Sequence, residues 1–234
     1  MRLAVSDLNS RYGPAHILFD VGLEVPECEV VALPGRNGAG KSTTLRSIVG
    51  LVASREGRIV FDGEDISRLP THQIARRGLG YVPEDRRIFS ELTVDENLMV
   101  GEQPPRPTAP TWTREKLFML FPNLAEMRDR PGGRMSGGEQ QMLTIARTLM
   151  GNPSLVLLDE PSEGLAPKIV EQMARAILAM KREGLSIVLS EQNLHFAKLI
   201  SDRVYIIEKG RIRFGGTIAE LEAKPEIRDA YLAV

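Results

Sequence analysis

Hydrophobic residues recur along this chain with two different periods, one typical of strands and one typical of helices. Residues 20–25 (DVGLEV) alternate polar and apolar side chains, which indicates a half-buried strand, and residues 29–33 predict a second strand beyond a turn at Pro26. Residues 155–158 (LVLL) are apolar without a break, as in a central parallel strand buried on both faces, and residues 186–190 (SIVLS) form a similar run. Such strands alternate with helical patterns, so we expect an α/β core with a parallel sheet.

Residues that start and stop helices delimit the helical patterns. We expect a helix over residues 42–49 that ends at Gly50, and another that opens at Pro167 and ends before Gly184. Residues 136–139 (SGGE) fit a capping box, in which serine and glutamate satisfy the first backbone N–H groups of a helix. The apolar residues that follow this box at helical spacing are Met142, Ile145, Ala146 and Leu149.

Two further segments are defined by their turn-forming residues. Residues 101–110 carry four prolines in ten positions, so this stretch is expected to be a loop. Thr113 is expected to cap the helix that follows, with Trp112 and Leu117 placed as a hydrophobic staple. Residues 203–214 predict a hairpin that turns at a Lys-Gly pair.

Composition and charge exclude several classes of protein. The 234 residues are 42% hydrophobic, which suits one domain with an elaboration. The formal net charge of -1 provides no basic field, and we predict no nucleic-acid partner. The single cysteine, Cys28, allows no intrachain disulfide and is expected in a turn, and the three histidines lack metal-ligand spacing. Residues 1–7 do not resemble a signal peptide and no apolar run could cross a bilayer, so we expect a soluble chain.

The most specific early motif is a glycine-rich loop after the apolar run at residues 30–33. Residues 35–42 (GRNGAGKS) match G-x-x-x-x-G-K-S, in which backbone N–H groups cradle phosphate and a helix N-terminus adds its dipole. Lys41 brings a positive charge to the β and γ phosphates, and Ser42 offers a hydroxyl to Mg²⁺. An ordinary glycine-rich turn before a helix is the alternative. The predicted phosphate-binding residues are Gly35, Asn37, Gly38, Ala39, Gly40, Lys41, Ser42 and Thr43.

Two carboxylates follow the apolar strand at residues 155–158. Ligands of open α/β sheets bind at the carboxyl ends of the strands, where Asp159 and Glu160 would lie. Asp159 is predicted to hold the Mg²⁺ shell, and Glu160 to take a proton from the attacking water. The alternative is an acidic turn without a chemical role.

With these motifs the chain strongly resembles the nucleotide-binding subunits of ABC transporters over essentially its whole length. Residues 136–140 (SGGEQ) resemble the family's signature motif, a helix N-terminus cleared of side chains by two glycines. The resemblance implies ATP and Mg²⁺ as cofactors, and a head-to-tail dimer in which the signature of one subunit covers the γ-phosphate held by the other. The signature residues implied to bind nucleotide are Ser136, Gly137, Gly138 and Gln140.

Other positions are carried over from the family one by one. Tyr12 resembles the aromatic residue that stacks on adenine, and residues 162–166 (SEGLA) stand where the family has its dimer-contacting D-loop. Glu84 stands at the position of the Q-loop glutamine, where its oxygen implies a metal role, and Gln192 at that of the catalytic switch histidine. These two positions depart from the family pattern: glutamate adds a negative charge, and glutamine cannot take up a proton as histidine does.

The resemblance also implies the organisation of the chain. We expect one ABC ATPase domain over 1–234, with an N-terminal antiparallel β subdomain and a P-loop core formed by 1–83 and 152–234, and an inserted helical subdomain over 84–151. The helical subdomain would contact the permease.

Three segments make one subfamily the best match. Residues 82–89 (VPEDRRIF), residues 191–193 (EQN) and the ending at 231–234 (YLAV) are similar to the second ATPase subunit of bacterial importers of branched-chain and related amino acids or amides. That resemblance implies pairing with a different ATPase subunit or with itself, and docking on two transmembrane permeases at the cytoplasmic face of the inner membrane. A periplasmic solute-binding protein would be an indirect partner. The alternatives are another ABC transporter ATPase (for urea or amides, or for export), a soluble non-transport ABC ATPase, and a subunit that binds nucleotide without hydrolysing it.

Overall fold

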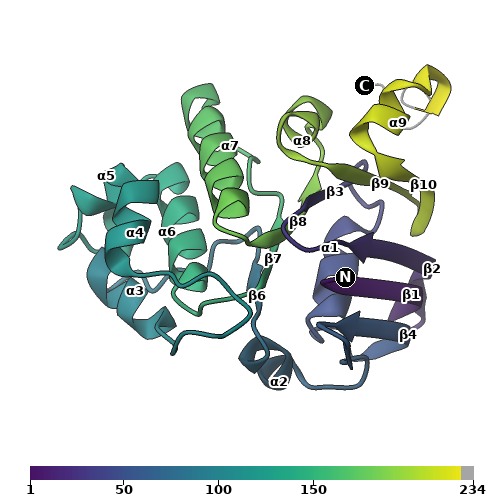
Figure 1. Cartoon of the computed structure of the whole chain (residues 1–234), viewed down its shortest axis with the longest axis horizontal. Helices are drawn as coiled ribbons and strands as arrows, with labels where there is room; N and C mark the ends of the chain where they lie inside the picture. Colours follow the sequence, from purple (N-terminus) through teal and green to yellow (C-terminus); the bar gives the residue numbers. More distant parts are fainter. Residues whose placement is uncertain (228–234) are drawn as a thin grey trace.

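A six-stranded sheet lies at the centre of the computed structural model, which describes residues 1–227 (Figure 1). The strand order is β10-β9-β3-β8-β7-β6, and all neighbours are parallel except β10, which returns antiparallel beside β9. The expected parallel core and terminal hairpin are therefore confirmed. The strands are β3 (Val30–Pro34), β6 (Leu79–Val82), β7 (Leu155–Asp159), β8 (Ser186–Glu191), β9 (Arg203–Glu208) and β10 (Arg211–Thr217).

Both faces of this sheet are covered, which explains its uninterrupted apolar strands. In β7, Leu155 and Leu157 belong to the hydrophobic cluster on one face, whereas Val156 and Leu158 belong to the cluster on the other. Successive side chains of a strand point to opposite faces, so each apolar pair serves a different core. The first core also contains α1 (Lys41–Ile48) and the N-terminal strands.

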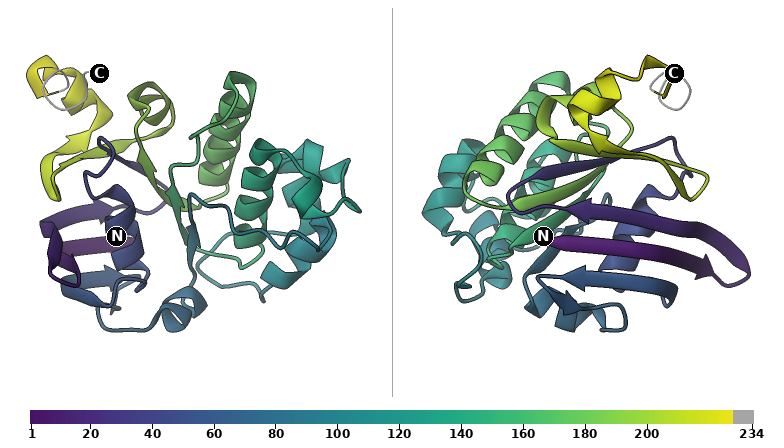
Figure 2. Two further views of the ribbon diagram at one scale, coloured as in Figure 1. Left: turned by 180° about the vertical axis from the view of Figure 1, so that it is seen from behind. Right: turned by 45° about the vertical axis from the view of Figure 1, so that its right-hand side comes forward.

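The N-terminal strands form a separate antiparallel sheet in the order β2-β1-β4-β5 (Figure 2). The alternating segment at residues 20–25 is the end of β2, so the strand is longer than predicted. Cys28 is exposed in the turn that follows, as expected. The strands are β1 (Leu3–Tyr12), β2 (Ala15–Val25), β4 (Ser54–Phe61) and β5 (Glu64–Asp65).

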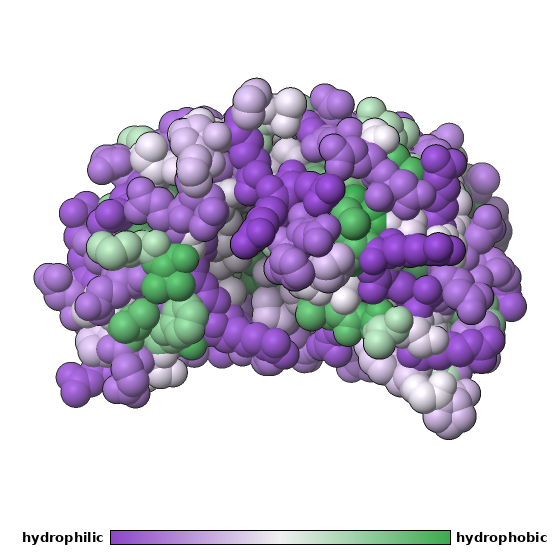
Figure 3. Space-filling model, turned by 90° about the horizontal axis from the view of Figure 1, so that it is seen from below, coloured by the Kyte–Doolittle hydropathy of each residue, from purple (hydrophilic) through white to green (hydrophobic). Residues whose placement is uncertain are grey.

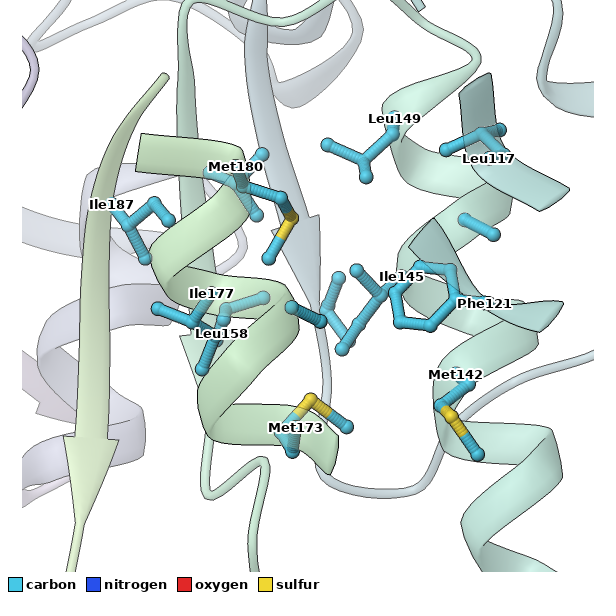
Figure 4. Packing of buried hydrophobic residues seen from close by; sticks show 14 of the residues in the cluster. Leu117, Phe121, Met142, Ile145, Leu149, Leu158, Met173, Ile177, Met180 and Ile187 are labelled. Atoms are coloured by element: carbon cyan, nitrogen blue, oxygen red, sulfur yellow. The ribbon is translucent and has the colours of Figure 1, made fainter. Parts of the chain in front are cut away.

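Helices cover the opposite face of the central sheet and extend beyond its β6 edge (Figure 1). Figure 4 shows buried side chains of α6 (Gly137–Leu149) and α7 (Pro167–Arg182), among them Ile145 and Ile177, packed in one cluster with Leu158 of β7. This contact joins the outer helices to the sheet. The remaining helices are α2 (Thr71–Arg76), α3 (Val94–Gly101), α4 (Arg114–Leu120), α5 (Pro122–Ala125), a 3₁₀ turn (Gly132–Arg134), α8 (Leu194–Ile200) and α9 (Ile218–Glu222).

Helix boundaries agree with the capping residues except at one point. Thr113 and Ser136 cap α4 and α6 through their side-chain oxygens, and Trp112 and Leu117 are both buried in the same core. The loop was expected to begin at residue 101, but Gly101 is the last residue of α3. The helix can extend this far because the first proline of the stretch is Pro104. The subfamily-like ending at 231–234 lies outside the described residues. None of the helices in residues 1–227 is long and apolar enough to cross a membrane.

Candidate nucleotide-binding and catalytic site

The glycine-rich loop joins the fully buried β3 to the start of α1. Gly40, the residue before α1, has φ +111°, and a Cβ there would lie 2.8 Å from the Leu18 side chain, so only glycine suits the position. The loop borders a cleft of about 460 Å³. The predicted site residues that line this cleft are Asn37, Gly38, Gly40, Lys41, Ser42, Thr43, Glu84 and Glu160, together with Ile17 and Glu163.

Lys41 is buried inside the loop and has three oxygen partners. Its ammonium donates to the carbonyl oxygens of Gly35, at 2.8 Å, and Arg36, at 3.1 Å. It also pairs with a carboxylate oxygen of Glu160 at 3.0 Å. The side chain is therefore held where phosphate oxygens could replace these partners.

Asp159 gathers three hydroxyl groups from different elements. Ser42 and Ser190 donate to its Oδ1 at 2.9 and 2.7 Å, and Tyr81 donates to its Oδ2 at 3.0 Å. Asp159 is fully buried and lies beside Ser190 in the register of β7 and β8. Burial, followed by the negative charge of Asp159, raises the pKa of the Tyr81 hydroxyl, which keeps Tyr81 a hydrogen-bond donor.

Glu160 follows Asp159 in a left-handed backbone conformation, with φ +48°. This conformation costs a non-glycine residue roughly 1 kcal/mol. The Glu160 carboxylate forms an ion pair with Lys41, and it accepts a hydrogen bond from Gln192, whose Nε2 lies 2.6 Å from its Oε2. Burial acts to raise the pKa of Glu160, but hydrogen bonds from Glu163 and Gln192 and the ion pair with Lys41 outweigh it and lower the pKa. Glu160 is thus held as a carboxylate by three partners, Lys41, Gln192 and Glu163.

Four further residues around these carboxylates were not among the predicted catalytic, nucleotide-binding or metal-binding residues, although Glu163 lies in the segment 162–166 expected at the dimer contact. Glu163 hydrogen-bonds Glu160, and this contact, with burial, raises the pKa of Glu163 to about 7. Glu191 is buried, which raises its pKa, and it accepts the backbone N–H of Ser162 at 3.1 Å. Ser190 could have been found, because it ends an apolar strand next to the one that carries Asp159. Tyr81 could not, since only the folded chain brings it to Asp159.

Besides the signature-like residues, five predicted residues lie outside the cleft lining: Tyr12, Gly35, Ala39, Asp159 and Gln192. Gly35 and Ala39 belong to the loop itself, whereas Tyr12 ends β1 with its side chain about half exposed at 45% and hydrogen-bonded to Arg46. An exposed aromatic ring is available for stacking on a planar base. In the described part of the chain, no cluster of three or more acidic, histidine or cysteine side chains is arranged to hold a metal ion.

The signature-like residues lie at the start of α6, outside the lining of the P-loop cleft. Ser136 and Glu139 form the expected capping box, and the Gln140 side chain donates to the Gly132 carbonyl at 3.1 Å. A Cβ at Gly137 would lie 2.5 Å from the Arg86 guanidinium, so a side chain there would displace Arg86. One chain therefore carries two separate helix N-termini suited to anions.

A groove of about 640 Å³ separates α2 and β6 from α3 and the end of α6. Its lining includes the exposed Phe89 and Val100 and three arginines, and the Arg147 guanidinium lies 4.9 Å from the Phe89 ring centre. Figure 3, which views the side of the molecule on which α2 lies, shows hydrophobic side chains on both sides of a hollow. The arginines are Arg76, Arg106 and Arg147.

Comparisons with known proteins agree with this geometry. The ABC transporter family model matches residues 18–163. The chain is 44% identical to the high-affinity branched-chain amino acid transport ATP-binding protein BraG of Pseudomonas aeruginosa, over 98% of this chain and 99% of BraG. It is 38% identical to the lipopolysaccharide export system ATP-binding protein LptB of Haemophilus influenzae, over 98% of this chain and 96% of LptB.

A solved structure extends the agreement to the fold. The ADP conformation of MJ1267, an ATP-binding cassette of an ABC transporter, superposes with a TM-score of 0.81 at 27% identity, over 97% of each chain. ABC ATPases of this kind bind ATP or ADP, hydrolyse ATP, dimerise and serve transmembrane subunits. The chain belongs to the ABC transporter family and is one of its ATP-hydrolysing, ATP-binding subunits.

Proposed function

We propose that the chain powers an importer of branched-chain or related amino acids. The observation that carries this proposal is the 44% identity to BraG, whose name describes branched-chain amino acid transport, over nearly the full length of both chains. The solute is carried by the transmembrane subunits, so the ATPase supplies energy and does not select the substrate. The proposed location is the cytoplasmic face of the inner membrane, held there through the permeases.

The residues around the P-loop suit Mg-ATP. Lys41 would neutralise the β and γ phosphates, and the Ser42 hydroxyl and the Asp159 carboxylate, whose oxygens are 2.9 Å apart, would share one Mg²⁺ or its waters. Glu84, across the cleft, would add a third oxygen. Because no protein cluster among the described residues could hold the metal alone, the ion would enter with the nucleotide, and it would offset phosphate charge.

Glu160 is the proposed general base. Its lowered pKa keeps it ionised, so it can accept a proton from water once phosphate oxygens take its place at Lys41. Gln192, which donates to Glu160, would hold that carboxylate or the γ-phosphate in position and is a proposed catalytic residue. Tyr12 would stack on adenine.

Hydrolysis is proposed to require a second ATPase subunit. Ser136, Gly137, Gly138 and Gln140 start α6 away from the chain's own cleft, so they would contact the nucleotide of a partner, either a different ATPase subunit or a second copy. Residues 162–166 would lie at that contact. ATP binding would close the pair, and hydrolysis would reopen it.

The groove beside α2 is the proposed docking site for the permease. It lies at the junction between the core and residues 84–151, which we propose as the helical subdomain, with 1–83 and 152–234 as the core. Its exposed Phe89 and Val100 would pack on the apolar face of a permease helix, and its three arginines would pair with acidic side chains of that helix.

The test is affinity purification of the tagged chain from detergent-solubilised membranes of its host, with mass spectrometry of the proteins that co-purify. We expect two multi-spanning permeases and a second ATPase, with uptake of radiolabelled leucine lost when the chain is deleted. A second candidate is lipopolysaccharide export, which the 38% identity to LptB favours. Recovery of lipopolysaccharide transport proteins would replace the importer proposal, and recovery of ribosomal or chromosomal proteins would remove the chain from transport.

A further inference from the structure

A buried acidic residue, Glu191, ends β8 and is only 2% exposed. Among residues 1–227, no lysine or arginine forms an ion pair with it. Burial raises the pKa of this carboxyl, and the hydrogen bonds that it accepts act against the rise. A buried carboxylate without a counter-ion is unfavourable unless hydrogen bonds occupy its oxygens, so the groups that bond it indicate its role.

The carboxylate of Glu191 joins two loops at the edge of the sheet. Its Oε1 accepts the backbone N–H of Ser162 at 3.1 Å, and its Oε2 accepts the backbone N–H of Asn193 at 3.4 Å. Ser162 is itself buried and begins the segment 162–166, of which Glu163 and Gly164 are exposed. The turn that follows Glu160 is thus tied to the loop that follows β8.

The backbone of Glu191 adds a connection to the P-loop. Its carbonyl accepts the N–H of Gly35 at 3.3 Å, and the residue lies beside Pro34 in the parallel register of β3 and β8. The main chain of Glu191 is therefore fixed by the sheet, so its side chain reaches Ser162 and Asn193 from a defined position.

Gln192 lies between the two anchored residues of this loop. Its side chain is exposed, and its amide nitrogen donates to the Glu160 carboxylate at 2.6 Å, which is its only side-chain contact among the described residues. A long exposed side chain loses conformational entropy when one contact holds it. The position of its backbone therefore decides how readily that contact forms, and Glu191 fixes this backbone on both sides.

We propose that Glu191 is a positioning residue for ATP hydrolysis. Its carboxylate ties Ser162 to the loop that carries Gln192, and this tie holds the Gln192 amide at Glu160. The inference rests on the catalytic role proposed above for Gln192. Glu191 acts only through Gln192, because it does not line the nucleotide cleft.

Glu191→Gln tests the tie with the least change in shape. A glutamine amide has one oxygen and one NH₂ group, so it can accept only one of the two backbone N–H groups. We expect kcat for ATP to fall about tenfold or more, as for a misplaced catalytic group. The KM and the equilibrium binding of labelled ATP should stay within about twofold, because the bond to Gly35 uses the backbone of Glu191.

A double-mutant cycle distinguishes positioning from a general loss of structure. Gln192→Ala alone should lower kcat, and adding Glu191→Gln to it should lower kcat by less than about twofold more, since the group that Glu191 positions is already absent. Phosphate release is measured without solute, in the complex that co-purifies with the chain. Failure of the importer proposal would therefore not alter the result.

The matched control is Asp202→Asn, which removes a carboxylate that accepts the Val30 N–H at 2.8 Å, at the opposite end of β3. It should lower the urea midpoint and leave kcat unchanged. Glu191→Asp keeps the charge but shortens the reach to Ser162, so it should reproduce the loss of kcat and replaces Glu191→Gln if circular dichroism shows that variant to be unfolded.

Three results would overturn the proposal, and they differ in what else they remove. If Gln192→Ala lowers kcat but Glu191→Gln and Glu191→Asp do not, only the positioning role of Glu191 is lost. If the losses from Glu191→Gln and Gln192→Ala multiply in the double variant, Glu191 acts independently of Gln192. If Gln192→Ala leaves kcat unchanged, the catalytic role of Gln192 is lost as well.

Discussion

At the scale of single residues, the position of Glu160 leads to the first prediction. Glu160→Gln removes the proton acceptor and the ion pair with Lys41 but keeps the shape of the side chain. We expect ATP binding to persist and turnover to fall by on the order of 10² or more, as for loss of a general base. The measurement is phosphate release by the reconstituted complex beside equilibrium binding of labelled ATP. Unchanged turnover would assign the chemistry to another group or to the partner's site.

The neighbouring Glu163 gives a prediction about pH. Its pKa is raised from 4.5 to about 7, chiefly by the hydrogen bond to Glu160 and then by burial. The folded state therefore binds this proton more tightly than the unfolded state, so this contribution to the free energy of unfolding falls as the pH rises from 4.5 through about 7. We expect Glu163→Gln to flatten that pH dependence.

Urea denaturation at several pH values between about 5 and 8 measures this effect. Glu126→Gln, at an exposed position outside the cleft, serves as the matched control and should follow the unsubstituted chain. If Glu163→Gln also follows the unsubstituted chain throughout, the hydrogen bond between the two carboxyl groups does not persist in solution.

At the scale of elements, the first turn of α6 combines a stabilising cap with a proposed nucleotide contact. Ser136→Ala removes the side-chain oxygen that accepts the Glu139 N–H, which should cost about 1 kcal/mol of unfolding free energy. We also expect ATP hydrolysis to fall. Thr217→Ala is the matched control, because Thr217 forms the same capping box with Glu220 at the start of α9. It should lose stability without losing turnover, and equal activity of the two variants would leave α6 only a structural role.

Elements with strong local signals were predictable from the sequence. The strands β3, β7 and β8 are recognised because burial on both faces leaves polar side chains only at their ends. Helices α6 and α7 are recognised because residues that start a helix coincide with helical spacing. The short elements were not anticipated. Helix α2 buries only Ile74, and β6 has only four residues, so their hydrophobic patterns are too short to read.

The same distinction holds within the candidate site. Lys41, Ser42 and Asp159 lie in motifs whose spacing reveals their chemistry, and the structure brings Ser42 and Asp159 into hydrogen-bond contact. Tyr81 reaches Asp159 from 78 positions away in the chain, and the ion pair between Lys41 and Glu160 spans a still longer separation. Contacts of this kind depend on the parallel arrangement of β6, β7 and β8, which no local pattern encodes.

At the scale of the whole molecule, the separation of the P-loop cleft from the start of α6 predicts that defects in the two surfaces complement each other. In a head-to-tail pair, each composite site takes its P-loop from one chain and its signature from the other. A chain with Lys41→Ala and a chain with Ser136→Arg should each be inactive alone. Their mixed pair retains one intact composite site, formed by the P-loop of the second chain and the signature of the first.

If the chain pairs with itself, random pairing makes half of the dimers mixed, so the mixture should regain up to about a quarter of the unsubstituted hydrolysis rate. Phosphate release by the two variants, assayed separately and after mixing with ATP, measures this recovery, and mixing either variant with itself is the control. A mixture no more active than its components would contradict pairing between copies of this chain. The two substitutions would then have to be divided between this chain and a different ATPase subunit. In that pair, the same reciprocal geometry predicts that Ser136→Arg in this chain abolishes ATP hydrolysis at the P-loop of the partner.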